Sequence, residues 1–269
     1  MIEPSALARE IADAYARRLL ITTPSSREGG LDLVTAYAIE RELVRLRQGE
    51  GHRTVGLKVG FANRAMWRVL KLDTLVWAHM YDNTVHHAPS NELEIPVGAM
   101  VAPRIEPEIV FRLKRPLEGA TDADAVLACV ESISLGFEII DCVYPDWKFT
   151  PVDFVAAYGL HAGLIVGAPL AVAPGDIPAL VEQLASFTVT LQKNSATVAT
   201  GAGKNSLKNP ALCLGELGSA IVRQGAEPIA AGEYVSSGTL TEAQSIAPGD
   251  TCTAVVEGIG LPPLTARIA

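Results

Sequence analysis

Two glutamates separated by one proline carry the clearest chemical signal in this chain of 269 residues. Glu106 and Glu108 lie in the run RIEPEIVF, residues 104–111. Alternate side chains of an extended strand share one face about 7 Å apart, so both carboxylates would point to one place. A third acid, Glu138, lies in an apolar run where a carboxylate is costly unless it is paired or coordinated. The three acids predict a site for a hard divalent cation.

A simpler interpretation of the pair stays open at this point. Proline within a strand is tolerated mainly on an edge or at a bulge, so Glu106 and Glu108 would then lie on the solvated face of an edge strand. Lys58 bears on the choice, because it is a lone cation in the apolar, glycine-flanked run GLKVG, residues 56–60. Lys58 either forms a salt bridge at a strand end or supplies the positive centre that receives the carboxylate of a substrate.

Three further positions carry polar groups suited to catalysis or binding. Asp82 either orients Lys58 or moves a proton, or else it caps a turn. His161 precedes an apolar strand and is either a proton carrier or a histidine whose hydrogen bonds are satisfied in the core. The hydroxyl and backbone N–H groups of Ser237 and Gly238 follow a short strand and are suited to binding a carboxylate.

Composition limits the class of protein. The formal charge of −8 and the pI near 5.2 argue against a nucleic-acid partner, because no basic run exists to neutralise phosphates. The N-terminus does not read as a signal peptide, and no apolar run is long enough to span a bilayer, so we expect no membrane partner and a cytoplasmic location. The four cysteines are scattered, which predicts core residues in a reducing compartment.

Hydrophobic periodicity divides the chain into two parts. Residues 1–50 show helical spacing interrupted near residues 22–26, which predicts a helical N-terminal segment of two helices. Residues 51–269 hold short β-rich runs between glycines and prolines, which predicts a β-rich catalytic domain. The predicted strands are 54–60, 105–113, 133–140, 163–166, 186–192, 234–236 and 251–256, and the predicted helices of this part are 123–131 and 210–224. Without strict β-α alternation, the fold class is α+β and not a doubly wound sheet.

In order and spacing, these motifs resemble the 2-keto-4-pentenoate hydratase and 4-oxalocrotonate decarboxylase family of the fumarylacetoacetate hydrolase superfamily. The matching pieces cover most of the chain after the N-terminal helices. They are GLKVG at 56–60, YD at 81–82, IEPE at 105–108, FEIID at 137–141, GAG at 201–203, SG at 237–238, PGD at 248–250 and GIG at 258–260. The resemblance implies a mixed β-roll of the fumarylacetoacetate hydrolase C-terminal type, an Mg²⁺ or Mn²⁺ ion and a homo-oligomer.

The resemblance also implies a role for each matching residue. The metal ligands would be Glu106, Glu108 and Glu138, the acid–base pair would be Lys58 and Asp82, and Ser237 with Gly238 would form part of the substrate cradle. The implied substrate is a small anionic 2-oxo acid that the ion activates as a Lewis acid. The implied activity is that of a hydro-lyase, which adds water to a 2-hydroxydienoate or an unsaturated 2-oxo acid in aromatic meta-cleavage-type catabolism.

Two departures from the family pattern keep other reactions open. The segment YGLH at 158–161 replaces the small polar residues NASS that are frequent there, and Asn83 stands where a second aspartate is frequent. His161 would add a substrate-binding or water-activating group. The alternatives are a decarboxylase of a 2-oxo-3-enedioate, an acylpyruvate hydrolase and, outside the enzymes, a metal-stabilised binding protein.

Overall fold

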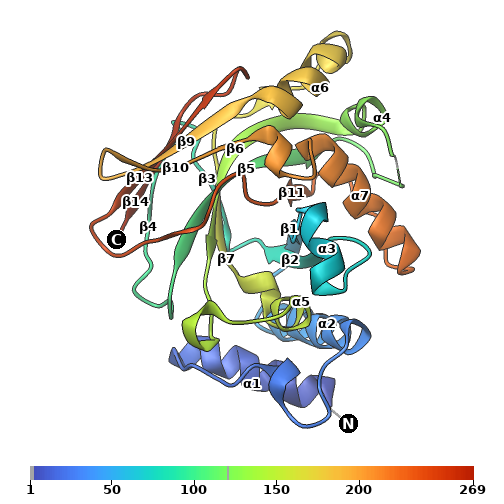
Figure 1. The fold of residues 1–269 in the computed structure, drawn as a ribbon, viewed down its shortest axis with the longest axis vertical. Helices are drawn as coiled ribbons and strands as arrows, with labels where there is room; N and C mark the ends of the chain where they lie inside the picture. Colours follow the sequence, from blue (N-terminus) through green and yellow to red (C-terminus); the bar gives the residue numbers. More distant parts are fainter. Residues whose placement is uncertain (1–2, 120) are drawn as a thin grey trace.

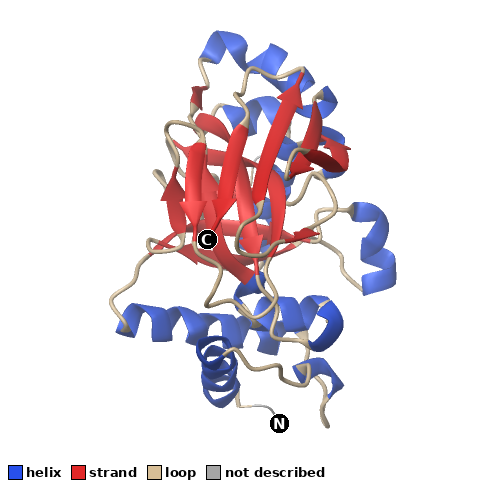
Figure 2. Cartoon of the chain, turned by 90° about the vertical axis from the view of Figure 1, so that its left-hand side faces the viewer, coloured by secondary structure: helices blue, strands red, loops and turns tan. Residues whose placement is uncertain are grey.

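Two mixed β-sheets form the centre of the protein, with helices gathered at both ends (Figures 1 and 2). The structure is a computed structural model and describes residues 3–119 and 121–269. In this part of the chain, a nine-stranded sheet has the order β2-β1-β11-β5-β6-β7-β3, with β12 beside β5 and β8 beside β6. A five-stranded sheet has the order β10-β9-β13-β14-β4. The expected α+β class with a mixed β-roll is confirmed.

The strands of the larger sheet are β1 Thr54–Gly60, β2 Val76–Tyr81, β3 Val85–His87, β5 Arg104–Leu113, β6 Val130–Ile140, β7 His161–Val166, β8 Leu170–Ala171, β11 Tyr234–Ser236 and β12 Gln244–Ser245. Those of the smaller sheet are β4 Glu92–Ile95, β9 Thr188–Lys193, β10 Ala196–Ala202, β13 Thr251–Glu257 and β14 Leu264–Ile268. The helices are α1 Pro4–Arg17, α2 Leu33–Gly49, α3 Arg64–Leu70, α4 Ala123–Leu127, α5 Pro151–Ala156, α6 Ile177–Ser186 and α7 Pro210–Arg223.

The N-terminal helices form where the periodicity predicts them. The carboxylate of Glu3 accepts hydrogen bonds from the first free N–H groups of α1, and Pro4 occupies the first turn, where its missing N–H costs nothing. The helix ends at Arg17 and is capped by Arg18, which adopts a left-handed conformation with φ of 54°. Helix α1 packs on α2, and α2 packs against α5, at the lower end of the molecule (Figure 1). The division into residues 1–50 and 51–269 stays a prediction.

The larger sheet has two different faces. One face of its central strands is apolar and fully buried in the main core, as at Ile105 and Ile109 of β5 and Ile139 of β6. Each such side chain contributes roughly 1.5–3 kcal/mol on burial. The other face carries the glutamates and, next to them, a small apolar cluster that includes Val110 on β5 and Leu164, which lies opposite Glu138 on β7. Period-2 alternation along β5 and β6 therefore separates the core from the chemistry.

Pro107 lies in a central strand and not, as the simpler interpretation required, in an edge strand. Strand β5 pairs with β6 along its length, but its other side pairs with β11 only from Val110 onward and with β12 only at residues 104–105. The carbonyl of Pro107 accepts the N–H of Leu240 in the gap between those two partners. The missing N–H of proline points into the same gap, so it removes no hydrogen bond of the ladder.

No helix within the described residues has both the length and the apolar character that a membrane crossing requires.

Candidate active site

The three glutamates converge at one end of the larger sheet. Glu106 lies directly opposite Glu138 in the antiparallel pairing of β5 and β6, so the two side chains project from the same face, and Glu108 follows two residues later. One carboxylate oxygen of each residue lies within 4.8 Å of the other two. Glu108 and Glu138 are buried, whereas Glu106 is partly buried. The convergence expected from the spacing is thus present in the structure.

Burial and mutual repulsion dominate the electrostatics of this cluster. Burial raises the pKa of Glu106 to about 7, against the opposing charge of Lys58. Burial also raises the pKa of Glu108 well above its usual value, and the charges of Glu138 and Glu106 add to the shift. Burial alone would raise the pKa of Glu138, but the charge of Lys58 and the hydrogen bond with His161 hold it below its usual value. A cation between these groups would remove the repulsion that the protein alone leaves in place.

Each buried glutamate has one oxygen fixed by the protein. The hydroxyl of Ser236 and the N–H of Gly238, 2.8 Å away, both donate to Oε2 of Glu108. Among the described residues, no hydrogen bond reaches Oε1 of Glu108. In Glu138, His161 holds Oε1, while Oε2 lies 2.9 Å from Nζ of Lys58 without a hydrogen bond of good geometry. Oε1 of Glu108 and Oε2 of Glu138 are therefore held in place but lack a full set of hydrogen bonds.

Lys58 reaches the carboxylates through a narrow space beneath the backbone of Gly159. Its side chain leaves β1, is almost fully buried, and lies with Nζ 4.8 Å from the centre of the Phe154 ring. The segment at Gly159 passes directly over this side chain: a Cβ at Gly159, whose φ is +58°, would lie 2.8 Å from Cδ of Lys58. Glycine at 159 therefore leaves the space through which Lys58 reaches Glu138.

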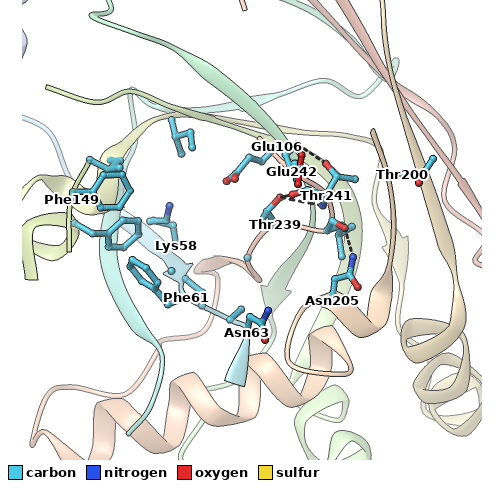
Figure 3. Close-up of a pocket in the computed structure, with 18 residues that line it drawn as sticks. Lys58, Phe61, Asn63, Glu106, Phe149, Thr200, Asn205, Thr239, Thr241 and Glu242 are labelled. Carbon is cyan, nitrogen blue, oxygen red and sulfur yellow. Dashed lines mark hydrogen bonds between the residues drawn. The ribbon is translucent and has the colours of Figure 1, made fainter. Parts of the chain in front are cut away.

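A cavity of about 550 Å³ opens onto this cluster. Lys58 and Glu106 contribute to its lining, and Figure 3 shows them facing one another. Phe61 and Phe149 stand on the Lys58 side, and Glu242 lies near Glu106 on the other. The remaining lining residues are apolar or carry neutral polar groups, among them Asn63, Phe154, Leu160, Thr200, Asn205, Gly238, Thr239 and Thr241. The cavity can hold a small acid with its carboxylate at Lys58 and its remainder along the aromatic wall.

The structure does not place Asp82 beside Lys58. Asp82 follows β2 at the far end of β1, and its carboxylate contacts the side chains of His52 and Arg53 at 3.4 Å. Ala78, and not Asp82, lies opposite Lys58. Hydrogen bonds to Arg53, with that of its backbone contributing most, lower the pKa of Asp82. The ammonium of Lys58 is instead paired with the carboxylate of Glu138. Residues 58 and 138 lie far apart in the sequence, so no local pattern indicates this pair.

Two predicted substrate contacts also lie elsewhere. Both ring nitrogens of His161 are engaged by protein groups, so the imidazole lies behind Glu138 and does not line the cavity. The hydroxyl of Ser237 is buried away from the cavity, which Gly238 does line. Sequence reasoning missed Ser236, the residue that binds Glu108. Ser236 lies opposite Lys58 on one neighbouring strand and opposite Val110 on the other, so its side chain shares their face of the sheet. That register is seen only in the structure.

The donor set fits a hard divalent ion. Three carboxylates supply oxygen ligands from two adjacent strands, and Oε1 of Glu108 and Oε2 of Glu138 still lack good hydrogen bonds. A buried carboxylate oxygen in this state is costly unless a cation binds it. Oxygen-only sites suit Mg²⁺ and Mn²⁺, whereas the absence of sulfur and imidazole from this group of described residues does not favour zinc or copper.

Known proteins similar in sequence to this chain include decarboxylases and hydratases of small organic acids. No protein-family model matches the chain. A 4-oxalocrotonate decarboxylase of Pseudomonas sp. (strain CF600) is 30% identical over 226 residues, which cover 83% of this chain and 81% of that protein. A 2-hydroxypent-2,4-dienoate hydratase of Pseudomonas putida is 29% identical over 218 residues, 80% of this chain and 94% of that protein.

The fold is also similar to that of a solved structure. It is the 4-oxalocrotonate decarboxylase from Pseudomonas putida G7, complexed with magnesium and adipate, which matches with a TM-score of 0.87 at 26% identity. The match covers 99% of this chain and 97% of that one. The likeness therefore includes the N-terminal helices as well as both sheets.

Proposed function

Because the chain belongs to the family of 4-oxalocrotonate decarboxylases and 2-keto-4-pentenoate hydratases, we propose that it is a hydro-lyase that depends on Mg²⁺ or Mn²⁺. Its reaction is the addition of water to a small 2-hydroxydienoate or unsaturated 2-oxo acid, in aromatic meta-cleavage-type catabolism. The observation that carries this proposal is the convergence of Glu106, Glu108 and Glu138 beside the buried Lys58 at a cavity.

The three glutamates would hold the ion through the oxygens that the protein leaves incompletely satisfied. When bound, the ion supplies Lewis-acid polarisation of the carbonyl group of the substrate. Magnesium in the similar decarboxylase structure supports this assignment. The hydrogen bonds from Ser236 and Gly238 keep Glu108 oriented, so that binding requires little rearrangement of the site.

Lys58 is the residue that we assign to proton transfer. Its ammonium is held at the cavity floor by Glu138, 2.9 Å away, and by the face of the Phe154 ring. From this position Nζ can bind the carboxylate of an incoming acid or exchange a proton with its reacting carbon. The carboxylate of Asp82 contacts Arg53 instead, so we assign this proton transfer to Lys58 alone.

The cavity lining favours a substrate with an uncharged tail. Within the lining, Lys58 is the single cation, and the aromatic side chains of Phe61 and Phe149 lie across the cavity from the acid groups of Glu106 and Glu242. A carboxylate at the far end of a dicarboxylic substrate would meet Glu242 instead of a positive charge. A monocarboxylic dienoate avoids this repulsion, which is why hydration is the first choice over decarboxylation.

Decarboxylation of a 2-oxo-3-enedioate is the second candidate. A second cavity of about 440 Å³ shares Asn63 and Asn205 with the first and contains Arg64, Lys204 and Lys208. A dicarboxylate long enough to pass the two asparagines would reach these cations, and the similar decarboxylase structure holds the dicarboxylate adipate. Under this alternative, replacing Lys204 and Lys208 with alanine would raise KM for the dicarboxylate and leave a monocarboxylate unaffected.

Assays of the purified protein with Mg²⁺ or Mn²⁺ separate the candidates. The expected result is conversion of 2-hydroxypenta-2,4-dienoate to the 4-hydroxy-2-oxo acid. The loss of the dienoate absorbance measures this conversion. Release of CO₂ from an enedioate would indicate the decarboxylase, and free pyruvate from an acylpyruvate would indicate the hydrolase. Metal-replete protein that is inactive on all three substrates would reject the proposal.

A matched variant separates an enzyme from a metal-stabilised binding protein. Lys58→Ala should abolish turnover and leave metal affinity nearly unchanged, because Lys58 contributes no ligand.

We also propose a homo-oligomer, as the family resemblance implies, and a cytoplasmic location, which the four free and buried cysteines support. Light scattering on the purified protein measures the first of these.

A further inference from the structure

A buried row of hydrogen bonds runs from the carboxylate cluster into the sheet behind it. Nδ1 of His161 lies 2.9 Å from Oε1 of Glu138, and Nε2 of His161 lies 2.9 Å from Oγ1 of Thr84. The side chains of Glu138 and His161 are almost completely buried. The row thus connects strands β6 and β7 with the turn between β2 and β3, on the side of Glu138 that faces away from the cavity.

Counting donors assigns the direction of each bond. An ionised Glu138 only accepts, so Nδ1 of His161 must carry the proton that it donates. A neutral imidazole then has Nε2 as an acceptor, and the hydroxyl of Thr84 is the donor available to it. The same hydroxyl also lies 3.0 Å from the carbonyl of Tyr81. When it turns to His161, that carbonyl keeps the hydrogen bond from the backbone N–H of Thr84, 2.9 Å away, so no group loses its only partner. Thr84 thereby selects the imidazole tautomer that serves Glu138.

This row determines where the second oxygen of Glu138 points. With Oε1 fixed by His161, the carboxylate cannot rotate, and Oε2 stays turned toward Lys58 and the other glutamates. Glu108 is held in the same manner, with Oε2 fixed by Ser236 and Gly238 and Oε1 left over. Both buried glutamates are therefore oriented by a protein donor on one oxygen, but only Glu138 depends on a histidine for it.

We propose that His161 is a positioning residue for the metal site, with Thr84 fixing its tautomer, and that it does not contact the substrate. The inference rests on the proposed metal-binding role of Glu138. Partners that orient a metal ligand typically contribute about 10- to 100-fold to metal affinity, so His161→Leu should weaken Mn²⁺ binding by that factor. Because the loss acts through the metal, a high Mn²⁺ concentration should restore kcat in this variant.

The test compares amide replacements that preserve one or the other of the two bonds. In His161→Asn the amide nitrogen takes the place of Nδ1, so the bond to Glu138 and most of the Mn²⁺ affinity should be kept. In His161→Gln the amide reaches the place of Nε2, where its oxygen can accept from Thr84, but no donor remains beside Glu138, so the affinity should fall as in His161→Leu. Thr84→Val should lower affinity, and Thr84→Ser, which retains the hydroxyl, should not.

Calorimetry with Mn²⁺ and no substrate provides the readout, together with the melting temperature measured in EDTA and in Mn²⁺. A positioning role reduces the metal-induced rise in melting temperature, whereas a merely structural role lowers both temperatures equally. Wild-type affinity in His161→Leu and Thr84→Val, or an equal loss in His161→Asn and His161→Gln, would overturn the inference while the metal site stands. Failure of the wild-type protein to bind Mn²⁺ would instead reject the proposed function and the inference together.

Discussion

Replacing Gly159 with alanine tests how the protein brings Lys58 to the carboxylates. The new Cβ would lie 2.8 Å from Cδ of Lys58 and 2.8 Å from Cβ of Ala78, whereas ordinary contacts begin at 3.4 Å. Ala78 belongs to a buried strand and cannot retreat, so the Lys58 side chain must shift by several tenths of an ångström. Such a displacement separates Nζ from Glu138 and from the substrate.

The stability cost of this substitution has two parts. A φ of +58° costs alanine about 1–2 kcal/mol relative to glycine, and overpacking adds about 1–3 kcal/mol. Gly225 provides a matched control, because its φ is +66° and a Cβ there would meet nothing within 4 Å. Gly225→Ala should therefore lose only the first part. Urea unfolding of both variants should show a difference of about 1–3 kcal/mol in the free energy of unfolding.

The catalytic cost separates the variants further. A misplacement approaching 1 Å at a reacting group can cost about 100-fold, so Gly159→Ala should lower kcat by roughly 10- to 100-fold, and Gly225→Ala should leave it unchanged. Mn²⁺ affinity should stay within a few-fold of the wild type in both, because neither glycine contacts a proposed ligand. Equal stability loss in the two variants, with wild-type kcat in Gly159→Ala, would refute the reasoning.

Three further predictions follow from other buried charges. Glu108→Gln should raise the melting temperature in EDTA, because burial disfavours the charged carboxylate, and should lower Mn²⁺ affinity measured by calorimetry; a lower melting temperature in EDTA would contradict this. Burial alone would lower the pKa of His79, but its hydrogen bond with Glu40, 2.7 Å long, and the charge of Glu40 raise the pKa above 6.5. This contribution to stability is full below pH 6.5 and is lost as the pH rises through the raised pKa, so unfolding at pH 5.5 to 8.5 should show a decline that His79→Gln removes. Asp141→Ala should cost several kcal/mol in urea unfolding, since the backbone N–H groups of Val101, Ala102 and Cys142 donate to this carboxylate at 2.7–3.0 Å; a loss below about 1 kcal/mol would contradict it.

Local signals predicted the strands that carry the site. Strands β1 and β11 begin and end at the predicted residues, because each is a short run with β-branched or aromatic residues that is bounded by glycine or polar residues. The helix predicted at 123–131 ends at Leu127 instead, since Val130 already pairs with Leu113 of β5. Long-range pairing overrides helical periodicity at that point. Helix α5 was missed although Thr150, Pro151 and Asp153 form a capping box that announces its start.

In the candidate site, too, the sequence predicted what depends on one strand and not what depends on pairing between strands. The E-x-E spacing predicted that Glu106 and Glu108 share a face, because that depends on one strand alone. The register that brings Glu138 opposite Glu106 depends on pairing across about thirty residues, so it was inferred from the cost of burying an acid and from the family resemblance. The partners of Lys58 and His161 depend on several strands together, so the sequence left a salt bridge for Lys58 and a hydrogen-bonded core position for His161 only as alternatives.

The most direct test of the metal site is a crystal structure of the protein with Mn²⁺ and a small 2-oxo acid such as pyruvate, recorded at the manganese absorption edge. One anomalous peak about 2.1 Å from an oxygen of each of Glu106, Glu108 and Glu138, with the acid bridging the ion and Nζ of Lys58, is the predicted result. A peak elsewhere on the protein, or none at these carboxylates, would contradict the account.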